Sequence, residues 1–179
     1  MPSYFLSTAL CLLLSFGAFT QTSAPTTPTQ IEAAYAWRVK QEMLYGVYIP
    51  RDLGEAFVQL TRLSEASGRE QFLRLSEQQA VTIPFFGLGR WISLNWGFYE
   101  GSRLTVYLNE LGLHHPDDMT RFVLVMYHRY LNKKPLNPQP VIAGFSEMRR
   151  TAETEQKLRG QILHEEIRKR EVPKAAGGE

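Results

Sequence analysis

The chain has 179 residues, enough for one domain with a real hydrophobic core, and 44% of them are hydrophobic while 21% are charged. Its formal net charge is only +2, and residues 48–135 hold ten basic residues against nine acidic ones. This balance provides no basic field of the kind that binds nucleic acid or anionic lipid, so we expect no nucleic-acid partner.

Residues 1–24 are predicted to be a secretory signal peptide, because a Leu-rich apolar run ends in small residues suited to cleavage after Thr20 or Ala24. No Lys or Arg precedes the run, so an uncleaved N-terminal anchor is the alternative and the only membrane contact that we expect. Cys11, the single cysteine, lies inside the run, so the mature chain would have no thiol or disulfide. We expect an exported protein, periplasmic or secreted, and a bacterial periplasm fits best.

Residues 25–30 are rich in Pro and Thr and are predicted to form an extended linker. Residues 31–137 are predicted to form a small, compact, all-α domain, since apolar residues recur at helical spacing and no convincing run alternates with the period of a strand. The first helix is expected over residues 31–46, with Gly46 as its stop.

The second helix is expected to begin at a capping box. Asp52 and Glu55 have the required spacing, and Gly68 is expected beyond the C-terminal end of the helix. Residues 69–75 fit a short third helix, and residues 76–80 fit a turn or a helical start.

Three further helices are expected in the aromatic-rich stretch that follows. The first lies between glycines in residues 87–97, and the second is capped by Ser102 and ends at Gly112. The third begins at Pro116, with two aspartates near its positive N-terminal end. Its buried stripe is predicted to consist of Met119, Phe122, Val123, Met126 and Tyr130.

Residues 138–179 are predicted to form a Pro-containing linker and a charged helical tail that begins at Ser146. Residues 147–171 hold seven basic and six acidic residues, with sparse apolar positions such as Leu158 and Ile162. This composition indicates a solvated helix that packs weakly or serves association. A disordered tail is the alternative.

Seven residues are candidates for ligand binding, because they are embedded among aromatic side chains or lie in the His-Pro-Asp turn. An aromatic cleft with a few fixed polar groups suits a sugar, peptide or lipid-like ligand. The alternative, which we favour, is a Trp-rich core whose polar groups are satisfied locally, and in which the first Trp matters more for stability than the second. The candidates are Arg90, Trp91, Asn95, Trp96, Arg103, His115 and Asp118.

The segment from His114 to Asp118 resembles a set of metal ligands, but its geometry is unsuitable. On one helix His128 would lie about 15 Å beyond Asp118, at 1.5 Å per residue, and zinc needs three or four convergent ligands. We therefore predict no metal and no cofactor, and we interpret His115 and the two aspartates after it as the N-terminal cap of a helix.

Three sequence blocks together resemble a family of uncharacterised bacterial domains. They are the Gly-Trp block FGLGRWISLNWG, the turn LGLHHPDDM and the ending YHRYLN, and the resemblance spans residues 48–136. It implies a small helical domain of unknown activity, and it carries over no catalytic residue.

The favoured function is that of an exported, non-enzymatic module that binds a protein partner or a small ligand through the Gly-Trp region. The alternative is a small hydrolase, metal-assisted or general, that uses His115 and Asp118 with Arg103 or His128. No nucleophile elbow supports catalysis, and no catalytic residue is predicted. A third possibility, nucleic-acid binding by the helix pair after Ser102, is disfavoured by export and by the near-neutral charge.

Overall fold

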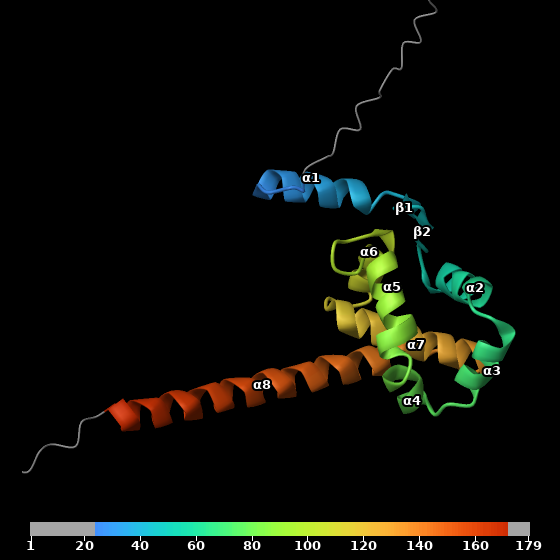
Figure 1. Ribbon diagram of the computed structural model, residues 1–179. Helices are drawn as coiled ribbons and strands as arrows, with labels where there is room; N and C mark the ends of the chain where they lie inside the picture. The colour runs from blue at the N-terminus through green and yellow to red at the C-terminus, as the bar shows by residue number, and fades with distance from the viewer. Residues whose placement is uncertain (1–23, 172–179) are drawn as a thin grey trace, which may run out of the picture.

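The computed structural model describes residues 24–171 and confirms an all-α fold, with one short hairpin added in this part of the chain (Figure 1). The predicted signal peptide, except for its last residue, lies outside the described residues. The elements in chain order are α1 (Pro28–Arg38), β1 (Met43–Leu44), β2 (Val47–Tyr48), α2 (Leu53–Leu63), α3 (Ala66–Leu73), α4 (Glu77–Thr82), the π-helix η1 (Phe85–Gly89), α5 (Arg90–Asn95), α6 (Arg103–Glu110), α7 (Pro116–Leu131) and α8 (Pro138–Glu171).

Helix α1 begins inside the segment that was expected to be a linker. The Thr27 side chain accepts a hydrogen bond from the backbone N–H of Gln30, whose own side chain accepts from the Thr27 N–H, so the Pro/Thr segment carries a complete capping box. None of the side chains of α1 is buried. Its C-terminal end is held by Arg38, which donates to the Glu100 carbonyl, and by Tyr35, which lies against Gly101.

The single helix expected over residues 31–46 is wrong in its second half. The chain leaves α1 after Arg38 and forms the antiparallel hairpin β1–β2. Tyr45 and Gly46 form its two-residue turn, with φ of 51° and 81°. Two successive left-handed residues match the right-handed twist of a hairpin, so this turn prevents the helix from continuing.

Helices α2 to α4 follow the local signals with two differences. The Asp52 carboxylate caps α2 by accepting from the Glu55 N–H at 2.9 Å, but the Glu55 side chain accepts from the N–H of Arg51 rather than that of Asp52, so only half of the expected capping box forms. Gly68, expected beyond the end of α2, lies inside α3, which begins earlier than predicted. Ser76 caps α4 through a capping box with Gln79, so the turn or helical start expected there is a helix.

Helix α7 is the centre of the domain, and α2, α3, α4, α5, η1 and α8 all pack against it. Every residue from Phe122 to His128 is buried, so the helix is enclosed on all sides rather than along one stripe. Tyr130, expected in the buried stripe, is 47% exposed and stacks on Phe57, whereas Tyr127 is 1% exposed. The stripe prediction is therefore wrong at Tyr130 and too narrow elsewhere.

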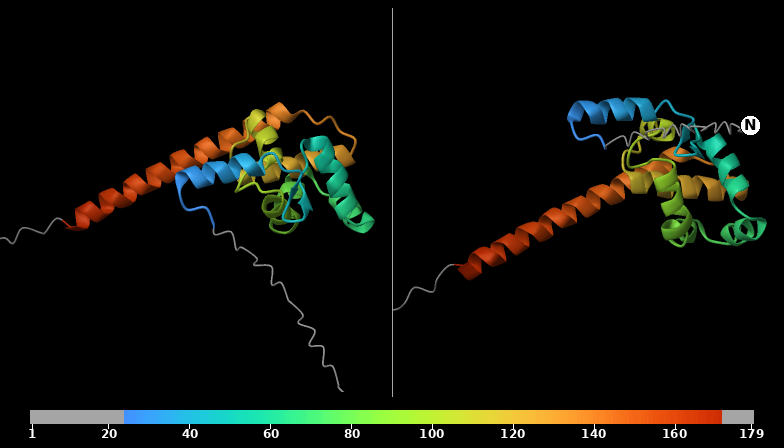
Figure 2. Two further views of the ribbon diagram at one scale, coloured as in Figure 1. Left: turned by 90° about the horizontal axis from the view of Figure 1, so that it is seen from above. Right: turned by 45° about the horizontal axis from the view of Figure 1, so that its top comes forward.

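Helix α8 begins at Pro138, not at Ser146, because prolines fit the first turn of a helix where no backbone N–H is needed. Ile142 and Phe145 are buried against the domain, and from residue 150 to residue 162 every side chain is exposed. Figures 1 and 2 show the helix projecting from the domain as a rod. Its 34 residues span about 51 Å at 1.5 Å per residue.

Within residues 24–171, no helix combines the length and the apolar character that crossing a membrane requires.

Candidate binding groove

The structure does not bring the seven candidate residues together. Trp96 is fully buried, and Trp91 is half-buried with its ring centroid 6.1 Å from that of Trp96. The Asn95 amide donates to the Trp91 carbonyl at 2.9 Å. These three residues belong to the core and its edge, and Trp96 rather than Trp91 is the more deeply buried indole. The buried Nε1 of Trp96 has no hydrogen-bond partner among the described residues, whereas the favoured interpretation expected local partners for the polar groups.

Arg103 lies elsewhere, at the junction of α6 with the hairpin and α2. Its Nε donates to the Ile49 carbonyl at 2.7 Å, and its guanidinium lies 5.0 Å from the centroid of the Tyr48 ring. Terminal nitrogens of the same group lie 3.3 Å from a Glu42 carboxylate oxygen and 3.5 Å from one of Glu55. Arg103 therefore joins three segments of the fold.

Glu55 is the acidic partner in this junction. Partial burial alone would raise the pKa of Glu55, but the backbone N–H of Arg51 and the Tyr48 hydroxyl donate to it, and the charges of Arg51 and Arg103 act in the same direction, so its pKa is lowered. The same hydrogen bond raises the pKa of Tyr48. Arg51, Tyr48 and Arg103 together stabilise the ionised carboxylate of Glu55. This cluster is a structural junction.

Arg90 is exposed at the start of α5, beside a small hollow of about 310 Å³ that also includes Phe86 and Tyr99. The Tyr99 hydroxyl donates to Asp117 at 3.0 Å, and this hydrogen bond raises the pKa of Tyr99. Phe86 is 81% exposed and Leu94 59% exposed. Arg90 thus lies near the start of α7, in a hollow whose lining includes Asp117 but not Arg103.

His115 caps α7, as predicted: its Nδ1 accepts from the Asp117 N–H at 3.2 Å. In the part of the chain that the structure describes, no group of three or more His, Cys, Asp or Glu side chains is arranged to hold a metal ion. The HHPDD turn acts as a helix start, with Nδ1 of His115 engaged by the backbone.

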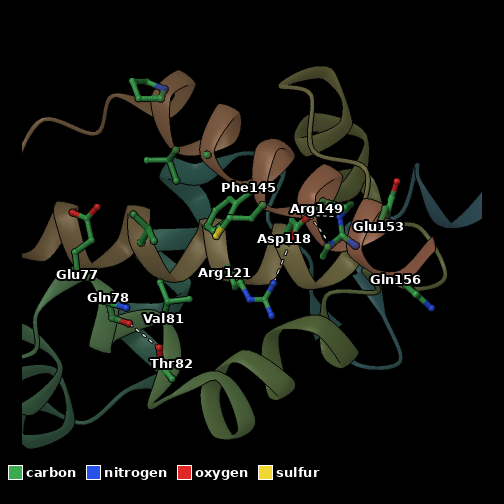
Figure 3. Close-up of a pocket in the computed structure, with 16 residues that line it drawn as sticks. Glu77, Gln78, Val81, Thr82, Asp118, Arg121, Phe145, Arg149, Glu153 and Gln156 are labelled. Carbon is green, nitrogen blue, oxygen red and sulfur yellow. Dashed lines mark hydrogen bonds and ion pairs between the residues drawn. The ribbon is translucent and has the colours of Figure 1, made fainter. Parts of the chain in front are cut away.

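A hollow of about 890 Å³ lies between α4, α7 and the first half of α8 (Figure 3). Apolar side chains from all three helices form its lining, namely Val81, Val125, Val141, Phe145 and Met148. Asp118, Arg121 and Arg149 lie toward one end, and Glu77 lies toward the other. We call this surface the α8 groove.

Asp118 anchors α8 at one end of the groove. Nε and a terminal nitrogen of Arg149 lie 2.8 and 2.7 Å from Oδ2 of Asp118, and Arg121 lies 3.4 Å from Oδ1. The Asp118 side chain is only 10% exposed, so this carboxylate is largely removed from water, whereas the Arg149 side chain is 34% exposed. The partner from α8 was missed at the sequence level, because Arg149 lies 31 positions away in a segment expected to be a tail.

Glu77 and Arg129 close the other end with a two-pronged ion pair. Nε of Arg129 donates to one carboxylate oxygen at 2.9 Å and a terminal nitrogen to the other at 2.5 Å. The remaining terminal nitrogen donates to the Leu136 carbonyl at 2.6 Å. The hydrogen bond from Arg129 lowers the pKa of Glu77. This arginine fixes α4, α7 and the loop that leads into α8.

Residues 49–131 match the model of a domain of unknown function, DUF6794. This segment is similar to the domains of an uncharacterised family. The match agrees with the resemblance seen over residues 48–136. Neither a curated protein nor a solved structure matches the chain. The matched segment ends with α7, so the family domain supplies two walls of the α8 groove, and α8 supplies the third from outside the match.

Proposed function

We propose that this protein is an exported, non-enzymatic binding module that holds an amphipathic α-helix of a protein partner in the α8 groove. The observation that carries the proposal is the groove itself, an open apolar trough bounded by charged residues. Recognition of a helix in a groove uses this arrangement, with apolar side chains of the ligand in the trough and polar groups at its edges.

The dimensions and chemistry of the groove support this occupant. Its volume of about 890 Å³ falls within the range of 300–1,000 Å³ that is typical of binding pockets. Met148 is 58% exposed on its rim, and a Cβ added at Gly144 would meet no atom within 4 Å. The trough thus has apolar surface to cover and room for a side chain of the ligand.

A non-catalytic role is supported by the state of the charged groups around the groove. Asp118 is bound by Arg149, and Glu77 is bound by Arg129. The lowered pKa of Glu77 makes it a poor general base, and the oxygens of Asp118 are occupied by Arg121 and Arg149. Export is supported by the signal-like sequence of residues 1–24, with a periplasmic or secreted location as the consequence.

The experiment adds a large side chain to the groove and removes none of the existing side chains. Gly144→Trp places an indole in the trough, and Gly160→Trp is the matched control, since Gly160 lies farther along α8 and also has no atom within 4 Å of an added Cβ. The probe is the apolar dye anilinonaphthalene sulfonate in dilute protein, followed by competition with a model peptide that carries leucines on one helical face.

We expect the parent chain and Gly160→Trp to enhance dye fluorescence and the model peptide to displace the dye. Gly144→Trp should lose most of the signal, and a scrambled peptide with leucines on all faces should displace little. Equal dye binding by all three proteins, or equal competition by both peptides, would contradict the proposal.

A further inference from the structure

We propose that the small hollow of about 310 Å³ between η1, α5 and the start of α7 binds a free amino acid with an apolar side chain, with its carboxylate at Arg90 and its ammonium group at Asp117. The hollow shares no lining residue with the α8 groove, so this site is separate from the function proposed above. The inference is carried by one cation and one anion that border the same apolar walls without pairing.

The apolar walls of the hollow are side chains that the fold leaves uncovered. Phe86, Leu94 and Tyr99 all line the hollow, and Tyr99 is 61% exposed while the other two are exposed to a similar or greater extent. The Phe86 ring meets the Phe85 ring edge to face, with centroids 5.5 Å apart, and the Arg121 guanidinium lies 5.1 Å from the Phe85 ring. The wall is supported from behind, and its outer surface is open to a ligand. Exposed apolar surface gathered in this way is typical of a binding site.

The π-helical turn η1 places this wall beside α7. At its C-terminal end, a Cβ added at Gly89 would lie 3.1 Å from Cγ2 of Thr120 and 3.4 Å from Cδ1 of Leu124. The missing side chain therefore allows η1 to approach α7 closely, and this approach brings Arg90 and Asp117 to one hollow. Turns of the π-helix type are rare and are frequent at functional sites.

Arg90 and Asp117 carry opposite charges, but they do not pair. Neither side chain forms an ion pair in the part of the chain that the structure describes. Oδ1 of Asp117 accepts from the Tyr99 hydroxyl at 3.0 Å, and no described group donates to Oδ2. The hydrogen bond to Asp117 raises the pKa of Tyr99, and the charge of Arg90 opposes this rise, so the guanidinium lies near the same hydroxyl. The arrangement suits a ligand that carries both charges.

A free amino acid matches the hollow in charge and in size. Its carboxylate can accept two parallel hydrogen bonds from the guanidinium of Arg90, and its ammonium group can donate to Asp117. An aromatic side chain of the ligand can then pack against the rings of the wall. The volume lies at the lower end of the 300–1,000 Å³ that is typical of binding pockets, which favours a small molecule over a peptide chain. A neutral sugar would leave both charges without a counter-charge.

The experiment compares three compounds by isothermal titration calorimetry with the purified protein. L-phenylalanine carries both charges, its N-acetyl derivative lacks the ammonium group, and its amide lacks the carboxylate. The protein should bind L-phenylalanine about tenfold more tightly than either derivative, because each derivative loses hydrogen bonds to a charged group. Equal affinity for the three compounds, or no binding of L-phenylalanine, would overturn the inference.

Two variants assign each charge of the ligand to its partner. Arg90→Gln should bind L-phenylalanine about tenfold more weakly and lose its preference over the amide, while the preference over the N-acetyl derivative remains. Asp117→Asn should show the reverse pattern. Arg62→Gln and Glu65→Gln are matched controls, because both residues are exposed and lie outside the hollow, and they should bind as the parent does. If Arg90→Gln and Asp117→Asn keep both preferences, the two charges do not recognise the ligand and the inference is wrong.

Phe86→Ala tests the wall without a change in the core. Because Phe86 is mostly exposed, the variant should melt with the parent, while its affinity for L-phenylalanine should fall severalfold and its affinity for glycine should stay the same. An unchanged preference for L-phenylalanine over glycine would contradict the placement of the ligand side chain. Gly144→Trp, in the α8 groove, should bind L-phenylalanine as the parent does, so each site can fail without the other.

Discussion

Helices α7 and α8 are the two longest helices described, and they are stabilised in opposite ways. The 16 residues of α7 are surrounded by six other elements and include a buried run on every side. The 34 residues of α8 are buried only near their start, and the rest depend on helix propensity and local charge pairs such as Glu147–Arg150. The length of a helix therefore does not predict its share of the core. Helix α7 forms the centre of the core, whereas most of α8 is exposed to solvent.

The largest expected effect comes from removing a side chain of α7. Phe122→Ala should lower the free energy of unfolding by about 3–5 kcal/mol, because Phe122 is fully buried and its loss leaves a cavity. The matched change on α8, Ile162→Ala in dilute monomer, should cost less than about 0.5 kcal/mol, since that residue is 57% exposed. Urea unfolding measures both, and similar values would break the comparison.

An intermediate effect is expected where the two helices meet. Arg149→Ala leaves the Asp118 carboxylate largely buried beside Arg121 alone, and it should destabilise the protein by about 1–3 kcal/mol. Arg150→Ala is the control, because Arg150 is exposed and pairs only with exposed Glu147. If thermal unfolding places both variants alongside the parent, α8 is not anchored through Asp118.

A smaller effect concerns pH, at the contact of α7 with α4. The hydrogen bond from Arg129 lowers the pKa of Glu77 below the ordinary 4.5, so the folded state binds this proton more weakly than the unfolded state. The resulting stability is present above about pH 4.5 and is lost as pH falls through the lowered pKa. Glu77→Gln and Arg129→Gln should each flatten the fall in melting temperature between pH 5 and pH 3. A slope equal to the parent's in both variants would contradict this linkage.

The smallest effect is expected from shortening α8. A chain that ends after Arg150 keeps Ile142, Phe145 and the Arg149 ion pair, so its melting temperature in dilute solution should match the parent's within the measurement. Far-ultraviolet circular dichroism should fall in proportion to the helical residues removed. A melting temperature several degrees lower would show that the exposed part of α8 stabilises the folded domain. The contrast between α7 and α8 would then not hold.

Local signals were readable from the sequence because their chemistry acts over three or four residues. Asp52, Ser102, His115 and Pro116 mark helix starts through capping or through the fixed φ of proline, and the structure has a helix start at each. The all-α class follows from the same short-range periodicity.

The missed features depend on contacts that no short window contains. The hairpin turn needs a left-handed φ at Tyr45. Tyrosine rarely adopts this conformation, and the neighbouring residues in the sequence do not indicate it. The groove depends on the ion pair between Arg149 and Asp118, which are 31 residues apart in the sequence. It also depends on the start of α8 at Pro138, eight residues before Ser146. Trp96 is likewise fully buried and Trp91 only half-buried, although both belong to the same Gly-Trp block.

The contact of Tyr35 with Gly101 fixes where α1 packs on the domain. Gly101 has a φ of 91°, and a Cβ there would lie 2.4 Å from the Tyr35 ring. Any other residue would both strain the backbone and displace the ring. Since α1 has no buried side chain of its own, its position on the domain would then depend on the hydrogen bonds of Arg38. The orientation of α1 is set by the absence of one methyl group.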